Sequence, residues 1–132
     1  MKSLVVEDDF ITRKLLQKIL SEFGEVDVAV NGDEAIEAFQ LARNQATPYN
    51  VIFLDIRLPG LDGHGALRAL RKRESELGIT EPDTVKVVMT TGVTEKNEVL
   101  SAFREGCEAY LKKPFERAAI LDTLKNLGLI QG

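Results

Sequence analysis

Carboxylate, threonine and lysine side chains follow the short apolar runs of this chain. In order along the sequence they are Glu7, Asp8, Asp9, Asp55, Thr90, Thr91, Lys112 and Lys113. Carboxylates that lie close together repel one another unless they are protonated or neutralised, so a cation and a converging lysine would be their natural partners. The ligands on offer are oxygen atoms, which select a hard ion, and Mg²⁺ fits better than zinc because it prefers a few carboxylates together with a phosphate. These residue types point to magnesium-dependent phosphate chemistry, if the fold brings them together.

The apolar residues predict the elements that would position these side chains. Five short runs are rich in β-branched residues, which is typical of strands buried on both faces of a parallel sheet. They occupy residues 4–6, 26–30, 51–54, 85–89 and 109–111. Between the runs, apolar residues recur at helical spacing. The helical positions expected to face the core are Leu15, Leu16, Ile19, Leu20, Phe23, Ala35, Ile36, Phe39, Ala42, Leu67, Leu70, Leu77, Val99, Leu100, Phe103, Ile120, Leu121, Leu124 and Leu127.

This alternation of strand and helix predicts an α/β fold of the (βα)5 type. Such units form right-handed crossovers, which gives a doubly wound parallel five-stranded sheet with helices on both faces. For five units the common strand order is the flavodoxin-like 2-1-3-4-5, in which ligands bind outside the carboxyl ends of the strands, at the switch point between strands 1 and 3. In that order the polar side chains described above converge on one rim of the sheet.

Several other residues are assigned to structure rather than to chemistry. Asp9 is interpreted as the N-cap of the first helix rather than as a metal ligand, and Asn31 as the N-cap of the second helix. Gly24 stands where a C-cap glycine of the first helix belongs. His64 is expected at the surface where the third helix opens, and the single cysteine, Cys107, is expected to be structural.

Length and charge limit the range of functions. The chain of 132 residues suits a single domain over residues 1–132, without an output domain. The net charge of −4 argues against direct nucleic-acid binding, because phosphate contacts need clustered Lys and Arg. The densest basic stretch precedes glutamates and is interpreted as a solvated helix face. It consists of Arg68, Arg71, Lys72 and Arg73. The chain lacks a long apolar run and a signal peptide, so we expect no membrane insertion and a cytoplasmic location.

Four segments carry a resemblance to a known family. They are residues 5–9 (VVEDD), 54–63 (LDIRLPGLDG), 89–92 (MTTG) and 110–115 (YLKKPF). In this order, and at these strand ends, they resemble the signature segments of bacterial two-component response-regulator receiver domains of the single-domain, chemotaxis type. The resemblance covers essentially the whole chain. The interval from Asp55 to Thr91 looks a few residues longer than usual, and the excess fits the polar stretch 73–83, away from the rim.

The resemblance implies a role for each acidic residue of the rim. Asp55 would be the phosphoacceptor and would attack the phosphorus of a phosphohistidine to form an acyl phosphate. Asp8 would bind Mg²⁺ directly and Glu7 would act through water. Asp55 itself and the backbone carbonyl of Arg57 would complete the protein ligands. The peptide bond before Pro114 would be cis, which would direct the preceding lysine.

The resemblance also assigns the residues around the phosphoryl group. Thr91 would donate its hydroxyl to one phosphoryl oxygen, and Lys113 would supply a cation for another. Thr91 and Tyr110 would form a switch that carries the phosphorylation signal to the surface. Arg57 and Val93 would flank the path of the water that hydrolyses the acyl phosphate. Because neither offers a carboxylate or an amide to orient that water, a persistent phosphoryl group is expected.

Together these assignments predict a phosphoacceptor signalling protein rather than an enzyme with a separate substrate. Its partners would be a sensor histidine kinase or a phosphotransfer protein, and a downstream protein target reached by direct contact within a phosphorelay. Three alternatives fit less well. A phosphatase of the haloacid dehalogenase type needs an acid where Arg57 stands, and a flavodoxin-like flavin carrier needs a Ser/Thr/Gly-rich loop at residues 7–9. A non-phosphorylated scaffold would not need the complete acidic set with Thr91 and Lys113.

Overall fold

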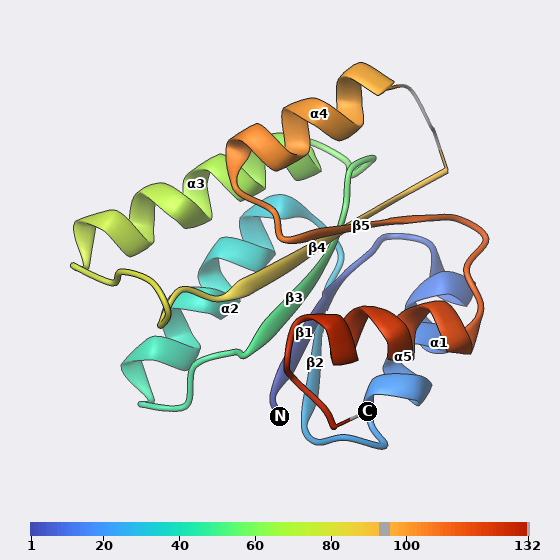
Figure 1. Cartoon of the computed structure of the whole chain (residues 1–132). Helices are drawn as coiled ribbons and strands as arrows, with labels where there is room; N and C mark the ends of the chain where they lie inside the picture. The colour runs from blue at the N-terminus through green and yellow to red at the C-terminus, as the bar shows by residue number, and fades with distance from the viewer. Residues whose placement is uncertain (93–95, 132) are drawn as a thin grey trace.

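The computed structural model describes residues 1–92 and 96–131, with the backbone alone for residues 96–98. In that part of the chain five strands alternate with five helices (Figure 1). The strands are β1 (Ser3–Val6), β2 (Val26–Ala29), β3 (Val51–Asp55), β4 (Lys86–Thr91) and β5 (Ala109–Lys112). The helices are α1 (Phe10–Leu20), α2 (Gly32–Asn44), α3 (Gly63–Glu76), α4 (Lys96–Glu105) and α5 (Arg117–Asn126).

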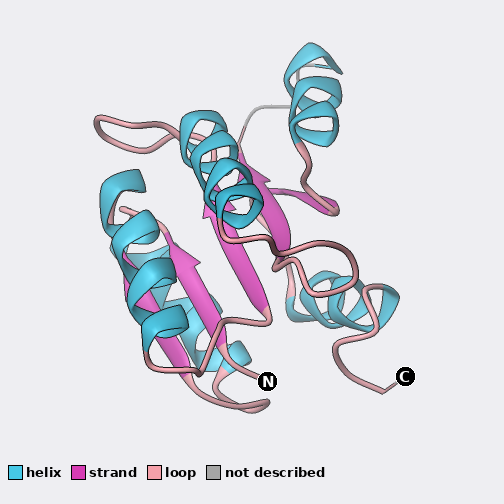
Figure 2. Cartoon of the chain, turned by 90° about the vertical axis from the view of Figure 1, so that its left-hand side faces the viewer, coloured by secondary structure: helices cyan, strands magenta, loops and turns pink. Residues whose placement is uncertain are grey.

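The strands form one parallel sheet with helices on both sides. Their order is β2-β1-β3-β4-β5, so the predicted (βα)5 fold with flavodoxin-like strand order is confirmed. Helices α1 and α5 cover one face of the sheet, and α2, α3 and α4 cover the other (Figure 1, Figure 2). Within the described residues, no helix has the length and apolar character needed to cross a membrane.

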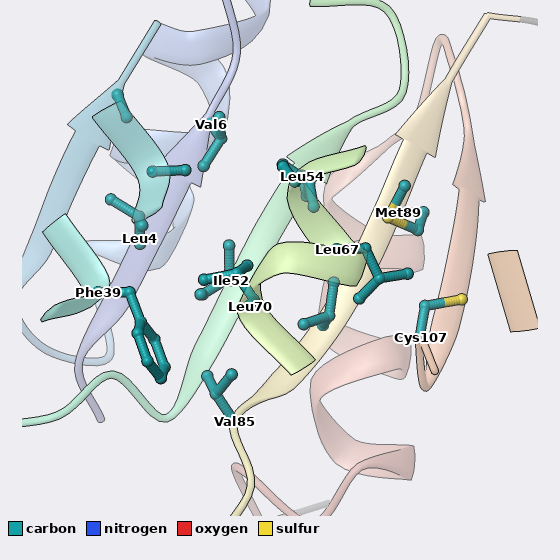
Figure 3. Packing of buried hydrophobic residues seen from close by; sticks show 14 of the residues in the cluster. Leu4, Val6, Phe39, Ile52, Leu54, Leu67, Leu70, Val85, Met89 and Cys107 are labelled. Carbon is teal, nitrogen blue, oxygen red and sulfur yellow. The ribbon is translucent and has the colours of Figure 1, made fainter. Parts of the chain in front are cut away.

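Each face of the sheet has its own apolar core. One cluster lies under α2, α3 and α4 and includes Phe39 and Leu54 (Figure 3). The other lies under α1 and α5 and includes Leu16 and Phe53. Successive strand residues point to opposite faces, so the run 51–54 supplies both clusters. This explains why the strand segments are continuously apolar rather than alternating with polar residues.

Four helical positions that were expected in the core are exposed instead. The exposed fractions lie between 41% and 46%. These residues are Leu15, Leu77, Leu100 and Phe103. Among residues 99–105 of α4, whose side chains are described, the buried one is Ala102. Helical spacing defines an apolar stripe, but the width of the buried part of that stripe depends on how the helix packs, which the spacing does not contain.

The helix caps agree with prediction at the start of α1 and α2 but not at the end of α1. Asp9 and Asn31 each accept a hydrogen bond of 2.8 Å from the backbone N–H three residues further on. Helix α1 already ends at Leu20, so Gly24 is not its C-cap glycine. Gly24 has a φ of 149°, and a Cβ at this position would lie 1.8 Å from the carbonyl oxygen of Met1. A glycine is needed here because the chain passes directly against its own N-terminus.

The basic stretch of α3 is not a uniformly solvated face, which corrects the sequence-based interpretation. Its other members are exposed, but the Arg71 side chain is only 19% exposed and contacts Glu74 at 2.7 Å and Glu108 at 2.9 Å. His64 is not a free surface residue either. Its side chain is 15% exposed, and Nδ1 lies 2.9 Å from a carboxylate oxygen of Glu105. Both residues join α3 to the end of α4.

Candidate functional site

The register of the sheet brings the polar residues at the strand ends to one edge. Residues 3–6 of β1 are aligned with residues 51–54 of β3. Glu7 directly follows β1, and Asp55 is the last residue of β3. Asp55 is aligned with Thr90 of β4, and Thr91 is aligned with Lys112 of β5. The carboxyl ends of parallel strands therefore gather these side chains at the predicted rim.

Three carboxylates at this rim lie within reach of one ion. One oxygen atom from each of Glu7, Asp8 and Asp55 lies within 4.8 Å of the other two. Glu7 is 1% exposed and Asp55 is 3% exposed, whereas Asp8 is open to solvent. Asp9 is next to this group in sequence, but its carboxylate caps α1, as predicted. The acidic residues are thus divided between a shared site and a helix cap.

Lys113 is the cation that faces these carboxylates. Its Nζ donates one hydrogen bond to Glu7 and another, of 3.0 Å, to Asp55. Burial, followed by the hydrogen bond with Asp55, raises the pKa of Glu7 to about 7 against the opposing effect of Lys113. Burial lowers the pKa of Lys113, but its hydrogen bonds to both carboxyl groups outweigh this and raise it. The peptide bond between Lys113 and Pro114 is cis, as predicted. We call Glu7, Asp8, Asp55 and Lys113 the rim cluster.

The loop after β3 fixes the direction of Asp55. The backbone N–H of Arg57 donates to a carboxylate oxygen of Asp55 at 3.1 Å, and the N–H of Ile56 donates to the carbonyl of Thr90 at 3.0 Å. Helix α3 then starts so close to the strand that a Cβ at Gly63 would lie 2.3 Å from the backbone oxygen of Asp55. Only glycine allows this approach. Sequence reasoning missed Gly63 as a site residue, because the close approach of α3 to Asp55 leaves no pattern in the sequence.

Thr91 and Tyr110 share the face of the sheet that α3 and α4 cover. Thr91 is fully buried and lies two residues beyond Met89, which is aligned with Tyr110. Tyr110 is half-buried and packs against the cluster under these helices. The backbone N–H of Lys113 donates to the carbonyl of Thr91 at 2.6 Å, which ties the two segments together. Val93, expected to influence the lifetime of the phosphoryl group, lies outside the described residues.

The donor set of the rim cluster fits Mg²⁺. The atoms that could bind an ion are carboxylate oxygens, and a single lysine leaves their negative charge incompletely neutralised. A hollow of about 430 Å³, lined in part by Asp8 and Arg57, adjoins them and leaves room for water and a phosphoryl group. Glu7, Asp8 and Asp55 are therefore the side chains that would hold the ion.

Sequence comparison relates the chain to known proteins. A family model described as the response regulator receiver domain matches residues 3–125. The chain is 33% identical over 128 residues to hybrid signal transduction histidine kinase L of Dictyostelium discoideum. That match covers 96% of this chain but only 7% of the kinase, so the chain spans a small part of this curated relative.

Solved receiver domains have the same fold. The chain matches the yeast complex of the histidine phosphotransfer signalling protein Ypd1 with the receiver domain of its downstream response regulator Ssk1, from Saccharomyces cerevisiae. The TM-score is 0.84 at 26% identity, over 99% of this chain and 90% of the matched chain. It also matches the receiver domain of sensor histidine kinase PA1611 from Pseudomonas aeruginosa, which has a magnesium ion coordinated in its active-site cleft. There the TM-score is 0.76 at 25% identity, over 96% and 95% of the two chains.

Proposed function

The chain belongs to the response regulator receiver domain family, and we propose that it accepts a phosphoryl group on Asp55 from a phosphohistidine in a Mg²⁺-dependent reaction. The observation that carries the proposal is the meeting of Asp55 with Lys113, at 3.0 Å, and with two further carboxylates within 4.8 Å. The phosphorylated chain would signal by protein–protein contact in a two-component phosphorelay. Its donor would be a sensor histidine kinase or a phosphotransfer protein.

The transfer step follows from the position of Asp55. A carboxylate oxygen attacks the phosphorus while the bond from phosphorus to the histidine nitrogen breaks. The electron pair of that bond returns to a protonated imidazole, which leaves as the neutral ring, and Asp55 becomes an acyl phosphate. Asp8, Asp55 and the backbone carbonyl of Arg57 would hold Mg²⁺, with Glu7 acting through water, and the ion would supply neutralisation of the charge on the phosphoryl oxygens.

Two residues of the neighbouring strand ends would then hold the new group. Lys113 now donates to a carboxylate oxygen of Asp55, and it would donate to a phosphoryl oxygen once the acyl phosphate has formed. Thr91, at the end of β4, would donate its hydroxyl to another. Catalysis here consists of positioning and charge neutralisation, which is what phosphoryl transfer generally requires.

The direct test is phosphorylation by a small donor. Incubation with acetyl phosphate and Mg²⁺ should add one phosphoryl group, measured by intact mass, and chelation of the metal should prevent it. Asp55→Asn should abolish the gain, because an amide cannot act as the nucleophile. Asp9→Asn is the matched control, since it also changes an acidic residue near the rim but keeps the helix cap. Undiminished labelling of Asp55→Asn would rule out Asp55 as the acceptor.

The phosphodonor has a candidate docking surface beside the rim. Three apolar side chains of α1 are exposed, namely Phe10 (57%), Ile11 (72%) and Leu15 (41%). Ile11 and Leu15 line a hollow of about 420 Å³ together with Lys113. An exposed apolar helix face next to the phosphoacceptor suits a helix of a histidine-bearing partner. The receiver domain of Ssk1 was crystallised with the histidine phosphotransfer protein Ypd1, which supports a phosphodonor of this class.

A substitution on α1 separates docking from chemistry. Ile11→Ser should slow transfer from a phosphorylated histidine phosphotransfer protein by roughly tenfold, because it removes apolar contact area. Uptake from acetyl phosphate should not change, since a small donor needs no docking surface. Leu41→Ser on α2 is the matched control, because Leu41 is also exposed, by 54%. Equal transfer rates for both variants would place the docking surface elsewhere.

Three narrower expectations remain predictions of this proposal. Arg57 and Val93 would leave the phosphoryl group persistent, which the decay of phosphorylated mass after donor removal would measure. Thr91 and Tyr110 would form the switch, so Thr91→Ala should still take up phosphate but lose the response at residues 99–110.

The chain would promote only its own phosphorylation and dephosphorylation, so we infer that it is not an enzyme with a separate substrate. Its organisation as a single receiver domain and its cytoplasmic location also remain predictions.

A further inference from the structure

Helix α3 holds the carboxyl end of α4 through three side chains on one of its sides. His64, Arg68 and Arg71 are separated by four and three positions, which places them in a row along the helix. Nδ1 of His64 lies 2.9 Å from one carboxylate oxygen of Glu105, and Arg68 donates to the other at 2.6 Å. Arg71 donates twice to the carbonyl of Gly106, at 3.0 Å and 2.7 Å. We call these three α3 residues together with residues 105–108 the α4 anchor.

The contact between His64 and Glu105 is shielded from solvent. The side chains of His64 and Glu105 are 15% and 14% exposed, whereas Arg68 is 62% exposed. Ser101, one turn earlier on α4, also donates to Glu105 at 2.7 Å. Burial works to raise the pKa of Glu105, but the hydrogen bonds from Ser101 and Arg68 and the nearby charges hold it below its usual value. Glu105 is therefore held as a carboxylate by groups on both helices.

The segment after α4 is fixed to the body of the protein by the same arginine. Arg71 also donates to both carboxylate oxygens of Glu108 at 2.9 Å, to Glu74 at 2.7 Å and to the carbonyl of Val85 at 2.8 Å. Glu108 in turn accepts from the backbone N–H of Val87 at 2.6 Å. The end of α4 is thereby joined to α3 and to the start of β4.

The described part of α4 before Glu105, residues 99–104, buries little apolar side-chain surface. Among the described side chains of this helix, residues 99–105, Ala102 is the buried one. Leu100 is 42% exposed and Phe103 is 46% exposed. Over its described side chains, residues 99–105, α4 has one small buried side chain and has its ionic contacts at the carboxyl end, so this stretch is fixed mainly at that end.

We propose that the α4 anchor is a fixed pivot, so that the change following phosphorylation of Asp55 turns α4 about its carboxyl end and stops at residues 105–108. The inference rests on the proposed function, because phosphorylation supplies the change. The two states would share the anchor and differ in the part of α4 that precedes it. A bistable element of this kind needs one end that does not move, so that a small shift at the rim becomes a rotation rather than a loss of packing.

The test compares Glu105→Ala with Arg104→Ala, a matched control at the neighbouring position, where the side chain is exposed. In the chain without substitutions, phosphorylation by acetyl phosphate with Mg²⁺ should shift the amide NMR signals of residues 99–103 several-fold more than those of residues 105–108. Glu105→Ala should take up phosphate normally by intact mass. Its shifts should extend through residue 108, and amide exchange over residues 101–108 should become about tenfold faster. Arg104→Ala should give the same shifts and exchange rates as the chain without substitutions.

Several outcomes would overturn the pivot. Equal shifts along residues 99–108 in the chain without substitutions would mean that the carboxyl end of α4 moves with the rest of the helix. Unchanged amide exchange and an unchanged pattern of shifts in Glu105→Ala would mean that the contacts of Glu105 do not hold the end of α4 in place. Arg68→Ala removes only the most exposed contact and should produce the same changes in weaker form, which covers the case of an unfolded Glu105→Ala. Absence of any mass gain in the chain without substitutions would instead refute the phosphoacceptor function, and the pivot with it.

Discussion

The rim cluster and the α4 anchor are both groups of charged side chains, and they differ in how completely their charges are matched. Among the ion pairs seen within the described residues, the rim cluster sets three carboxylates against one lysine. In the α4 anchor each carboxylate meets a guanidinium group, because Arg68 contacts Glu105 and Arg71 contacts both Glu108 and the neighbouring Glu74. Backbone N–H groups of Val85 and Val87 also donate to Glu74 and Glu108. An unmatched set of buried carboxylates is costly until a cation joins it, whereas a matched set is already satisfied. The difference separates a group built to bind from a group that holds the fold.

Removing a cation from the matched group should have the largest effect on stability. Arg71→Met would leave the carboxylate of Glu74, 2% exposed, and that of Glu108, 20% exposed, without their guanidinium. We expect the free energy of unfolding to fall by about 3 kcal/mol, because breaking a buried ion pair leaves an uncompensated charge. Urea unfolding at neutral pH measures this. Arg73→Met is the matched control on the same helix, and its exposed side chain should contribute less than about 0.5 kcal/mol.

A small loss in Arg71→Met would remove the distinction between the two groups. If the free energy of unfolding fell by less than about 1 kcal/mol, the network around α4 would stabilise the fold no more than surface ion pairs do, since these contribute about that much or less. The comparison would then rest on the rim cluster alone.

Removing a carboxylate from the unmatched group should have the opposite effect on stability. Asp8→Asn relieves repulsion in the rim cluster, so the metal-free chain should become slightly more stable, by up to about 1 kcal/mol. Mg²⁺ binding should weaken by roughly 10- to 100-fold, because a ligand is lost. Calorimetric titration with Mg²⁺ and urea unfolding in chelator measure the two effects. Asp9→Asn should change neither, since its oxygen still caps α1.

The reverse ranking of these two aspartates would overturn the assignment of ligand and cap. If Asp9→Asn weakened Mg²⁺ binding more than Asp8→Asn, Asp9 would have to leave the cap and join the ion. The hydrogen bonds that its carboxylate now accepts from Thr12, at 2.8 Å and 2.7 Å, would then be broken in the metal-bound chain.

The two groups also differ in how far the sequence could predict them. Glu7, Asp55 and Lys113 stand at strand ends, and the register of a parallel sheet brings such positions together whatever the details of packing. Arg71 and Glu108 are far apart in sequence and meet because α3 and α4 pack in one particular way. Charge on a helix face does not contain that information, so the basic stretch of α3 was assigned to solvent.

The same reasoning explains the exposed apolar residues of α1 and α4. The helical period places Leu15 and Phe103 on the apolar sides of their helices, but both side chains are exposed. How much of a stripe is covered depends on the angle and distance at which the helix meets the sheet. Gly63 is a different case, because its role depends on the close approach of α3 to Asp55, a distance that no sequence pattern contains.

Glu7 gives the rim cluster a dependence on pH that the sign of its pKa shift determines. Its pKa is raised from 4.5 to about 7, first by burial and next by the hydrogen bond with Asp55. Between these values the folded, metal-free chain keeps a proton that the unfolded chain has lost. The folded state binds more protons, so this group's contribution to stability is complete below pH 4.5 and is lost as the pH rises to about 7.

Mg²⁺ should therefore bind more tightly and stabilise more strongly at pH 8 than at pH 6. Near pH 6 the ion competes with the proton on Glu7, so its apparent affinity should be about tenfold weaker than at pH 8. Calorimetric titration at the two values measures this, and the rise in melting temperature caused by Mg²⁺ should follow the same order. Glu7→Gln should bind Mg²⁺ weakly but almost equally at both values, because it has no proton to release, whereas Asp9→Asn should keep the full difference. A pH dependence that survived in Glu7→Gln would assign the titration to another group and leave Glu7 as a buried partner of Lys113 only.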